Sequence, residues 1–333
     1  MGKRVGSRIE EALIKAERGE RCFMPSTEAD QRWLQRASVQ GVVAHPARGL
    51  YARMEYWENL THHQQALHVL RALSVHHPDW VFAGPSAALA HGLELGYQQL
   101  KRPCIASTRQ AHAEQQKSAS HIIVTGDSSV IRQGIRVTSF ARTVYDCIRS
   151  MTFPDALALA DSALRSKGIN RERLALNLCH LFGTYPGARR MRAIIGLADG
   201  RSENGGESKA RAQMIKLGFE IPDLQREIPD PLDPTTCHRI DYAWDLWNGS
   251  TVFGELDGRD KYFDPAMTGG KGLEDVLLAE RRRESRVTIG DRPIKIVRFS
   301  YAEACNDAYF TRLLESYGIP RVPSSYDPSV ITF

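Results

Sequence analysis

The sequence of 333 residues is long enough for two or three domains, each with its own hydrophobic core. Its hydrophobic content of 42% and charged content of 25% are typical of globular proteins and exclude a disordered chain. The formal charge of +5 is compatible with an anionic partner such as nucleic acid, and no apolar run reaches the roughly 18 residues that a membrane span needs. Because the six cysteines are scattered and no signal peptide is evident, we expect reduced thiols and a cytoplasmic location.

The first 58 residues predict two helices followed by a hairpin. Apolar residues at helical spacing favour a helix over 8–18. Thr27 and Asp30 form a start signal for the second helix, and Gly41 marks its end. The stretch VVAHPARGLYARMEYW is apolar and interrupted by proline and glycine, as in a short hairpin with Arg48 near its tip. This order is typical of a small winged helix, and we place the first module at 1–58.

Four arginines of this module are candidates for contact with DNA, because basic side chains on a helix and a hairpin supply the nonspecific part of DNA affinity. They are Arg32, Arg36, Arg48 and Arg53. Acidic neighbours nearly balance these charges, so a solvated face of mixed charge is the alternative interpretation.

Residues 59–200 predict a mixed α/β domain without a recognisable site. A helix over 61–77 precedes the strand-like WVFAG, a short helix and the strand candidates HIIVTG and IRVTSF, and further helical segments follow. The chain contains no P-loop, no dinucleotide-binding fingerprint and no GxSxG nucleophile motif, so we expect no small-molecule cofactor.

Residues 201–333 predict the element order α-β-β-β-α-β-α. The first helix covers 207–217, strands follow in QREI, HRIDYAWDLW and TVFGELDG, and a second helix precedes the strand PIKIVRFS. With the two preceding regions, this order indicates an α/β fold in three domains, 1–58, 59–200 and 201–333. Glu207, Ala210, Met214 and Leu217 recur at steps of three and four, which places Glu207 on the core-facing side of its helix.

Carboxylates lie among the apolar residues of two neighbouring strands. Glu255 and Asp257 are two residues apart and therefore share a face of their strand. The partner of Asp241 depends on the loop that joins the strands. A two-residue loop pairs Asp241 with Leu256, on the face opposite Glu255, whereas a three-residue loop pairs it with Asp257 and gathers the acids on one face. The alternative is an edge strand with one solvated face.

Converging acids repel one another unless a cation neutralises them. Oxygen ligands with few His or Cys favour Mg²⁺ or Mn²⁺ over zinc, and such an ion can activate water at a phosphodiester. Lys261 follows Asp257 in the next turn and is a candidate for orienting the nucleophile. Glu280 and Arg283 lie on the apolar side of the following helix, where a salt bridge packed near the sheet explains them equally well without chemistry.

The segments ENGGESKAR, RIDYAW, GELDGRDKY and AERRRESR occur in this order over about 201–299. They resemble the PD-(D/E)XK nuclease superfamily, and more closely the endonuclease-like domains related to very-short-patch-repair enzymes. The resemblance implies an αβββαβ restriction-endonuclease-like core. The residues implied for catalysis are Glu207, Asp241, Glu255, Asp257 and Lys261, the first four as ligands of Mg²⁺ or Mn²⁺, with Glu280 and Arg283 in support. The family has a lysine where this chain has Asp257, so a degenerate domain without hydrolysis is the alternative.

The segments ARGLYARMEYW, GPSAALAHGLEL and GIRVTSFARTVYD resemble the antitoxin and transcriptional-regulator proteins of type IV toxin–antitoxin (abortive infection) systems. This resemblance implies a winged-helix DNA-binding module, a middle antitoxin-type domain, and DNA and a cognate toxin as partners. We therefore expect either a DNA-binding protein with a Mg²⁺-dependent endonuclease domain, or a regulator or antitoxin with a degenerate nuclease fold. A protein-interaction scaffold with neither activity is a third hypothesis.

Overall fold

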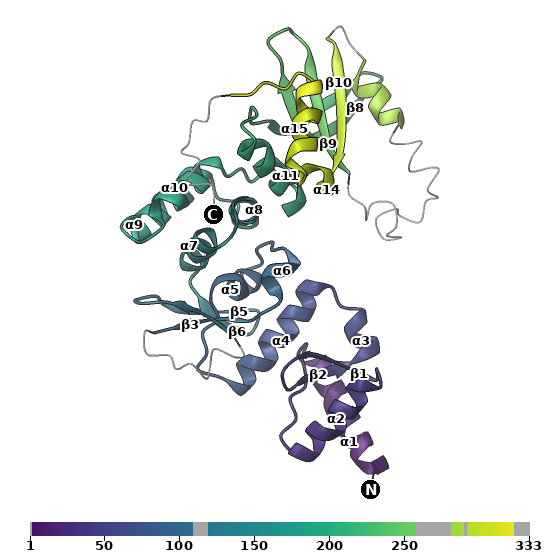
Figure 1. Ribbon diagram of the computed structural model, residues 1–333, viewed down its shortest axis with the longest axis vertical. Coiled ribbons are helices and arrows are strands. Elements are labelled where there is room, and N and C mark those ends of the chain that lie inside the picture. The colour runs from purple at the N-terminus through teal and green to yellow at the C-terminus, as the bar shows by residue number, and fades with distance from the viewer. Residues whose placement is uncertain (1, 109–118, 258–280, 290–291, 323–333) are drawn as a thin grey trace. The chain divides into compact units, whose positions relative to one another are not determined.

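The computed structural model describes residues 2–108, 119–257, 281–289 and 292–322 of the chain (Figure 1). The chain forms two compact units, 1–150 and 151–333. Each unit contains both helices and strands, which confirms the mixed α/β class at that level. Residues 151–200 belong to the same unit as the C-terminal sheet, although the sequence predicted a boundary after residue 200. They do so because helix α11 (Gly205–Lys216) packs along helix α8 (Phe153–Lys167).

The first unit begins with two helices and a hairpin, in the predicted order. These elements are α1 (Gly2–Arg18), α2 (Glu28–Val39), the antiparallel strands β1 (Val43–Ala47) and β2 (Leu50–Arg53), and α3 (Met54–Glu58). Helix α2 begins after Thr27, whose side chain accepts a hydrogen bond from Asp30 N (3.2 Å), and it ends before Gly41, whose φ is +74°. Ile9, Leu34 and Tyr51 are buried between α1, α2 and the hairpin.

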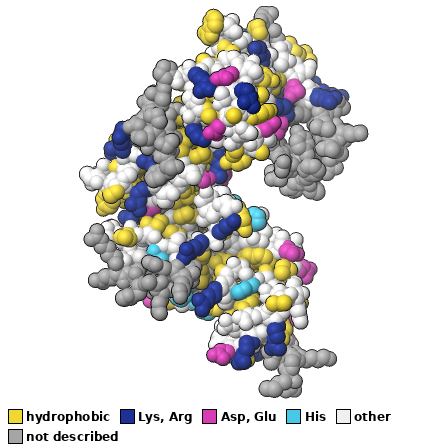
Figure 2. All heavy atoms as spheres, viewed as in Figure 1, with side chains coloured by type: hydrophobic (Ala, Val, Ile, Leu, Met, Phe, Trp, Pro, Cys, Tyr) yellow, Lys and Arg dark blue, Asp and Glu magenta, His cyan; other side chains and the backbone are white. Residues whose placement is uncertain are grey.

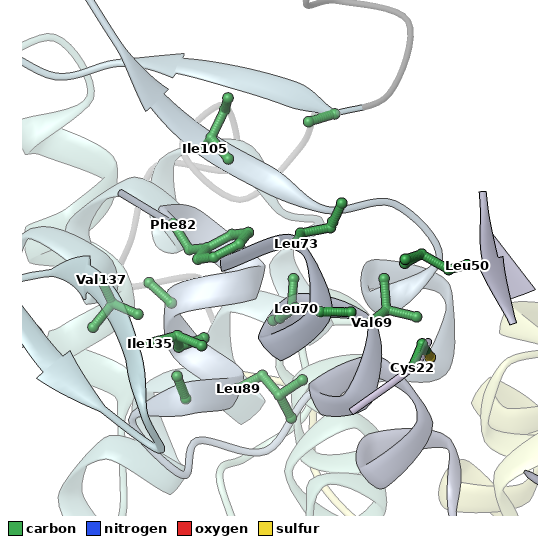
Figure 3. Packing of buried hydrophobic residues seen from close by; sticks show 14 residues of the cluster. Cys22, Leu50, Val69, Leu70, Leu73, Phe82, Leu89, Ile105, Ile135 and Val137 are labelled. Carbon is green, nitrogen blue, oxygen red and sulfur yellow. The ribbon is translucent and has the colours of Figure 1, made fainter. Parts of the chain in front are cut away.

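The rest of this unit packs helices against two small β-ribbons. Its elements are α4 (His62–His76), α5 (Gly84–Ala90), α6 (Tyr97–Leu100), the parallel pair β3 (Cys104–Ser107) and β4 (Ser120–Ile123), the antiparallel pair β5 (Ser129–Arg132) and β6 (Ile135–Thr138), and α7 (Phe140–Ser150). The predicted strand WVFAG is reduced to isolated bridges from Phe82 to Ile105 and Val137, because Gly84 and Pro85 already start α5. Figure 3 shows Phe82 in the core of this unit, together with Leu70 and Leu89.

The second unit contains a helical part and a four-stranded sheet. Its elements are α8, α9 (Arg171–Phe182), α10 (Ala188–Leu197), α11, β7 (Asp223–Asp230), β8 (Asp233–Asp245), β9 (Thr251–Asp257), a helix at 281–287, β10 (Ile294–Ser300), α14 (Tyr301–Ala304) and α15 (Asp307–Ser316). The strand order is β10-β9-β8-β7, with β7, β8 and β9 antiparallel and β10 parallel to β9. The predicted order α-β-β-β-α-β-α is therefore confirmed for the described elements.

Both faces of this sheet are covered. Tyr242 and Phe299 belong to the larger core, which includes residues of α11, α14 and α15, whereas Ile240 and Phe253 pack with Val287 on the other face. Ile240 and Tyr242 are two residues apart but lie in different cores, so the alternation of β8 changes phase between them. Of the helices in the described ranges, none is long and apolar enough to cross a membrane.

Candidate functional site

Glu207 lies in the first turn of α11, and its carboxylate accepts hydrogen bonds from the residues that precede the helix. Asn204 is the N-cap, and its Oδ1 accepts a hydrogen bond from Glu207 N (3.0 Å). The Glu207 carboxylate accepts bonds from Asn204 Nδ2 (2.6 Å) and Glu203 N (2.8 Å). Glu207 is 5% exposed, so the predicted position on the core-facing side is confirmed. These bonds satisfy amides at the helix start, which is a structural role in itself.

Asp241 lies on β8, and a single amide connects it with Glu207. Gln225 Nε2 donates to Glu207 Oε2 (2.9 Å) and contacts Asp241 Oδ1 at 3.5 Å. The other Asp241 oxygen accepts a hydrogen bond from Leu256 N (3.0 Å) on β9. Gln225 has a φ of +51°, an unusual conformation for a residue other than glycine, and it lies across from Asp241 where the alternation of β8 changes phase. This irregularity in the sheet brings two of the predicted acids to one amide.

The register between β8 and β9 differs from both predicted registers. The observed pairs run from Asp245↔Thr251 to Tyr242↔Gly254, one or two positions away from the registers that the two loops predict. Both predicted loop lengths are wrong, because the connection between the strands is longer and occupies residues 246–250. Asp241 contacts β9 through its side chain instead, since its Oδ2 accepts the hydrogen bond from Leu256 N (3.0 Å).

Glu255 lies between two arginines. Its Oε1 accepts a hydrogen bond from Arg283 Nη2, and its Oε2 accepts one from Arg298 Nη2 (2.8 Å). Arg298 is the register partner of Glu255 on β10, and it also contacts Asp257 Oδ1 (3.2 Å) and Glu284 Oε1 (2.5 Å). We call Arg283, Glu255 and Arg298 the arginine clamp. It gives the predicted residue Arg283 a partner on the sheet.

Electrostatics connect the arginine clamp to the other acids. Burial and the charge of Arg298 lower the pKa of the Arg283 guanidinium, while the charges of Asp241 and Glu284 act in the opposite direction. The Asp241 carboxylate is thus close enough to stabilise the charged form of Arg283. In this arrangement, guanidinium groups provide the positive charge that converging carboxylates require.

The described residues do not fit a site in which three carboxylates share one ion. Both oxygens of Glu255 already bind arginine, and no three His, Cys, Asp or Glu side chains of the described residues are grouped so that they could hold a metal. Mg²⁺ requires several oxygen ligands in near-octahedral geometry. Two predicted residues, Lys261 and Glu280, lie outside the described residues. The geometry of the described residues therefore supports charge pairing at Glu255 of the inner strand β9 rather than a metal centre.

A second candidate surface lies on α2. Leu34 and Ala37 are buried on its inner side, whereas the outer side presents two amides, two guanidiniums and an apolar side chain to solvent. These exposed residues are Gln31, Arg32, Gln35, Arg36 and Val39. Val39 is 90% exposed and supplies the apolar group of this face. Amide, guanidinium and apolar groups on one helical face are the groups that read base edges in the major groove.

The other two predicted arginines differ in their surroundings. Arg48 is exposed in the turn between β1 and β2, as predicted from the hairpin. Arg53 instead binds Glu17 of α1, with Nη2 2.6 Å from Oε2 and Nε 2.9 Å from Oε1, and this bond raises the pKa of Arg53. Arg53 therefore holds the hairpin against α1 and does not join the exposed set. Basic and acidic side chains are interspersed on the face shown in Figure 2.

Two residues of the C-terminal site were missed by the sequence reasoning. Arg298 alternates with apolar residues in PIKIVRFS, and this period-two pattern could have indicated a charged side chain facing the next strand. Gln225 left no such signal, since a positive φ at glutamine is not readable from the sequence.

Comparisons with known proteins give limited information. The chain is 34% identical over 111 residues to the uncharacterized protein MT2308 of Mycobacterium tuberculosis strain CDC 1551 / Oshkosh, and equally to the uncharacterized protein Rv2248 of strain ATCC 25618 / H37Rv. Each match covers 33% of this chain and 40% of the relative, so less than half of each relative is matched. No family model matches the chain. No solved structure matches the chain significantly.

Proposed function

We propose that this protein binds DNA through the outer face of α2 and the β1–β2 hairpin, and that its C-terminal unit is a nuclease-like domain that does not need to cleave the bound DNA. The observation that carries the proposal is the exposed set on α2, together with Arg48 in the hairpin turn. Helix α2 precedes the hairpin directly, the order in which a winged helix places its recognition helix and its wing.

The chemistry of the exposed set suits sequence readout. Arginine can donate both bonds of a pair to guanine, glutamine can pair with adenine, and an aliphatic side chain such as Val39 can contact the thymine methyl group. Arg32 lies 3.6 Å from Glu28, but both side chains are largely exposed. Such an exposed ion pair contributes little free energy, so Arg32 can exchange Glu28 for a phosphate or a base at low cost. Arg48 in the hairpin turn would contact the phosphate backbone.

The element order of the second unit supports the nuclease-like part of the proposal. Three antiparallel strands follow α11, and β10 returns parallel to β9, which is the order that the PD-(D/E)XK resemblance implies. In the arginine clamp, both carboxylate oxygens of Glu255 bind arginine, and Glu255 is the strand glutamate that would bind the metal in such a site. This favours a regulator or antitoxin, and it makes a cognate toxin a candidate partner alongside DNA.

The test is selection of bound duplexes from a randomised DNA library. We expect the wild-type protein to enrich one sequence, because the α2 residues discriminate base edges. Gln35→Ala should alter the enriched sequence at one or two positions, while Arg312→Ala, an exposed arginine on α15, should leave it unchanged. The proposed readout by α2 is wrong if the wild-type protein enriches no sequence from the library. It is also wrong if the Gln35→Ala protein enriches the same sequence as the wild-type protein.

A second candidate function is Mg²⁺-dependent hydrolysis of DNA by the C-terminal unit. One observation favours it: two of the predicted acids, Glu207 and Asp241, are brought to a single amide of Gln225. Incubation with supercoiled plasmid and Mg²⁺ or Mn²⁺ tests it. Nicking that disappears in both Asp241→Ala and Glu255→Ala would establish the activity, and intact plasmid would contradict it.

A further inference from the structure

A partly open cavity of about 140 Å³ belongs to the first unit. Its inner wall is formed by Val69 and Leu70 of α4 and Leu89 of α5, which also belong to the core shown in Figure 3. The outer wall includes Pro46 and Ala47 of β1, so an occupant would also contact the hairpin that leads to Arg48. All these walls belong to one compact unit.

The volume limits what the cavity can hold. Pockets for drug-sized ligands are typically about 300–1,000 Å³, whereas an apolar cavity of about 150 Å³ is large enough for benzene. A single aromatic ring with one small substituent is therefore the largest flat ligand that fits. The side chains of Trp57 and Tyr97 also line the cavity and add aromatic surface to its wall.

The polar groups at the cavity indicate the charge of the ligand. Lys101 lines it, with Nζ 5.4 Å from the centroid of the Tyr97 ring, and the His62 ring lies tilted against the same ring with the two centroids 4.2 Å apart. Among the described residues, those that line the cavity include no Asp or Glu, so Lys101 gives its rim a positive charge. A buried hydroxyl is present as well: Ser86 Oγ accepts a bond from Cys104 N (2.8 Å), which uses an acceptor site of the hydroxyl and not its hydrogen.

We propose that this cavity binds a monocyclic aromatic carboxylate, with the ring between Trp57 and the aliphatic wall and the carboxylate at Lys101. A cation at the rim of an otherwise apolar cavity complements a ligand that is apolar at one end and anionic at the other. The assignment does not depend on DNA binding, because every residue it uses lines the cavity.

The direct experiment is titration calorimetry of the full chain with benzoate and with its neutral counterpart benzyl alcohol. We expect benzoate to bind with a Kd on the order of 0.1–1 mM, which is reasonable for a ligand of this size. Lys101→Met should weaken benzoate binding about tenfold or more, since it removes a charge-assisted bond, and should change benzyl alcohol binding less than about twofold. Lys295→Met, an exposed lysine on β10, is the matched control and should change neither.

A cavity-filling variant tests the location. Ala66→Leu adds three carbon atoms to a residue that lines the cavity, and it should abolish binding of both compounds. Because this variant could also perturb folding, the methyl resonances of Val69 and Leu89 in the wild-type protein provide an independent readout and should shift on saturation with benzoate. The proposal is overturned if benzoate shows no binding up to about 10 mM, or if its binding is the same in Lys101→Met. Methyl resonances that stay unchanged at saturation would overturn it as well.

Discussion

The arginine clamp makes Glu255 a stabilising residue, and Glu255→Ala tests this directly. The glutamate side chain is 9% exposed, and its two partners, Arg283 and Arg298, retain 30% and 25% exposure. Removal of one member of a fully buried ion pair costs about 3–5 kcal/mol, because the remaining charge is left without a partner. Since both arginines are partly solvated, we reduce this to about 2–3 kcal/mol of unfolding free energy.

Thermal unfolding followed by circular dichroism measures the loss. For a unit of this size, about 2–4 °C of Tm corresponds to each kcal/mol, so Glu255→Ala should lower Tm by about 5–10 °C. Asp257→Ala is the matched control: its side chain is 39% exposed and contacts Arg298 at 3.2 Å, so the loss should stay below about 1 kcal/mol. A Glu255→Ala protein that is as stable as Asp257→Ala would refute the clamp as a stabilising device.

Three further predictions concern the rest of the chain. Asp161 is fully buried and binds Arg211 at 2.8 Å, so Asp161→Ala should destabilise the second unit by about 3–5 kcal/mol in urea unfolding, with Asp155→Ala, a partly exposed acid on the same helix, as the milder control. Burial acts to raise the pKa of Asp199 and Asp223, but the hydrogen bonds and charges of neighbouring arginines, Arg201 in both cases, together lower it below the usual 3.8. A lowered carboxyl pKa contributes stability that is present above the usual pKa and is lost on acidification, so Arg201→Gln should flatten the acid limb of the stability profile. Burial raises the pKa of the Cys104 thiol to about 11, and that of Cys147 also rises, so the disulfide reagent DTNB at pH 8 should modify the exposed Cys237 and Cys305 first; rapid labelling of Cys147 in the native protein would contradict this.

Several features were predictable because local chemistry determines them. The limits of α2 follow from the Thr27 cap and from Gly41, whose positive φ ends the helix. The buried position of Glu207 was predicted correctly because Glu207 shares one side of its helix with Ala210 and Met214, which are both buried in the core. The exposed position of Arg48 follows from a two-residue turn between two short strands.

Other features depend on tertiary contacts that no local pattern encodes. The β8–β9 register was mispredicted because Leu246 belongs to the turn and not to the strand. Leu246 is apolar and packs into the larger core, so its sequence pattern is that of a strand residue. The phase change at Asp241 accompanies the positive φ of Gln225 on a different strand. Arg298 reaches Glu255 through a parallel pairing of β9 and β10, and the sequence gives no register for two strands separated by a helix.

The central claim is that α2 and the hairpin bind DNA, and the salt dependence of affinity tests it most directly. Fluorescence anisotropy with a labelled duplex, repeated at several NaCl concentrations, gives the slope of log K against log salt. Each phosphate contact contributes about −0.9 to this slope, and of the two residues only Arg48 is assigned to the phosphate backbone. The double variant Arg36→Ala, Arg48→Ala should therefore bind more weakly, with a slope shallower by about 1 than that of the wild-type protein. A wild-type protein that fails to bind, or a double variant with the same affinity and slope, would contradict the claim.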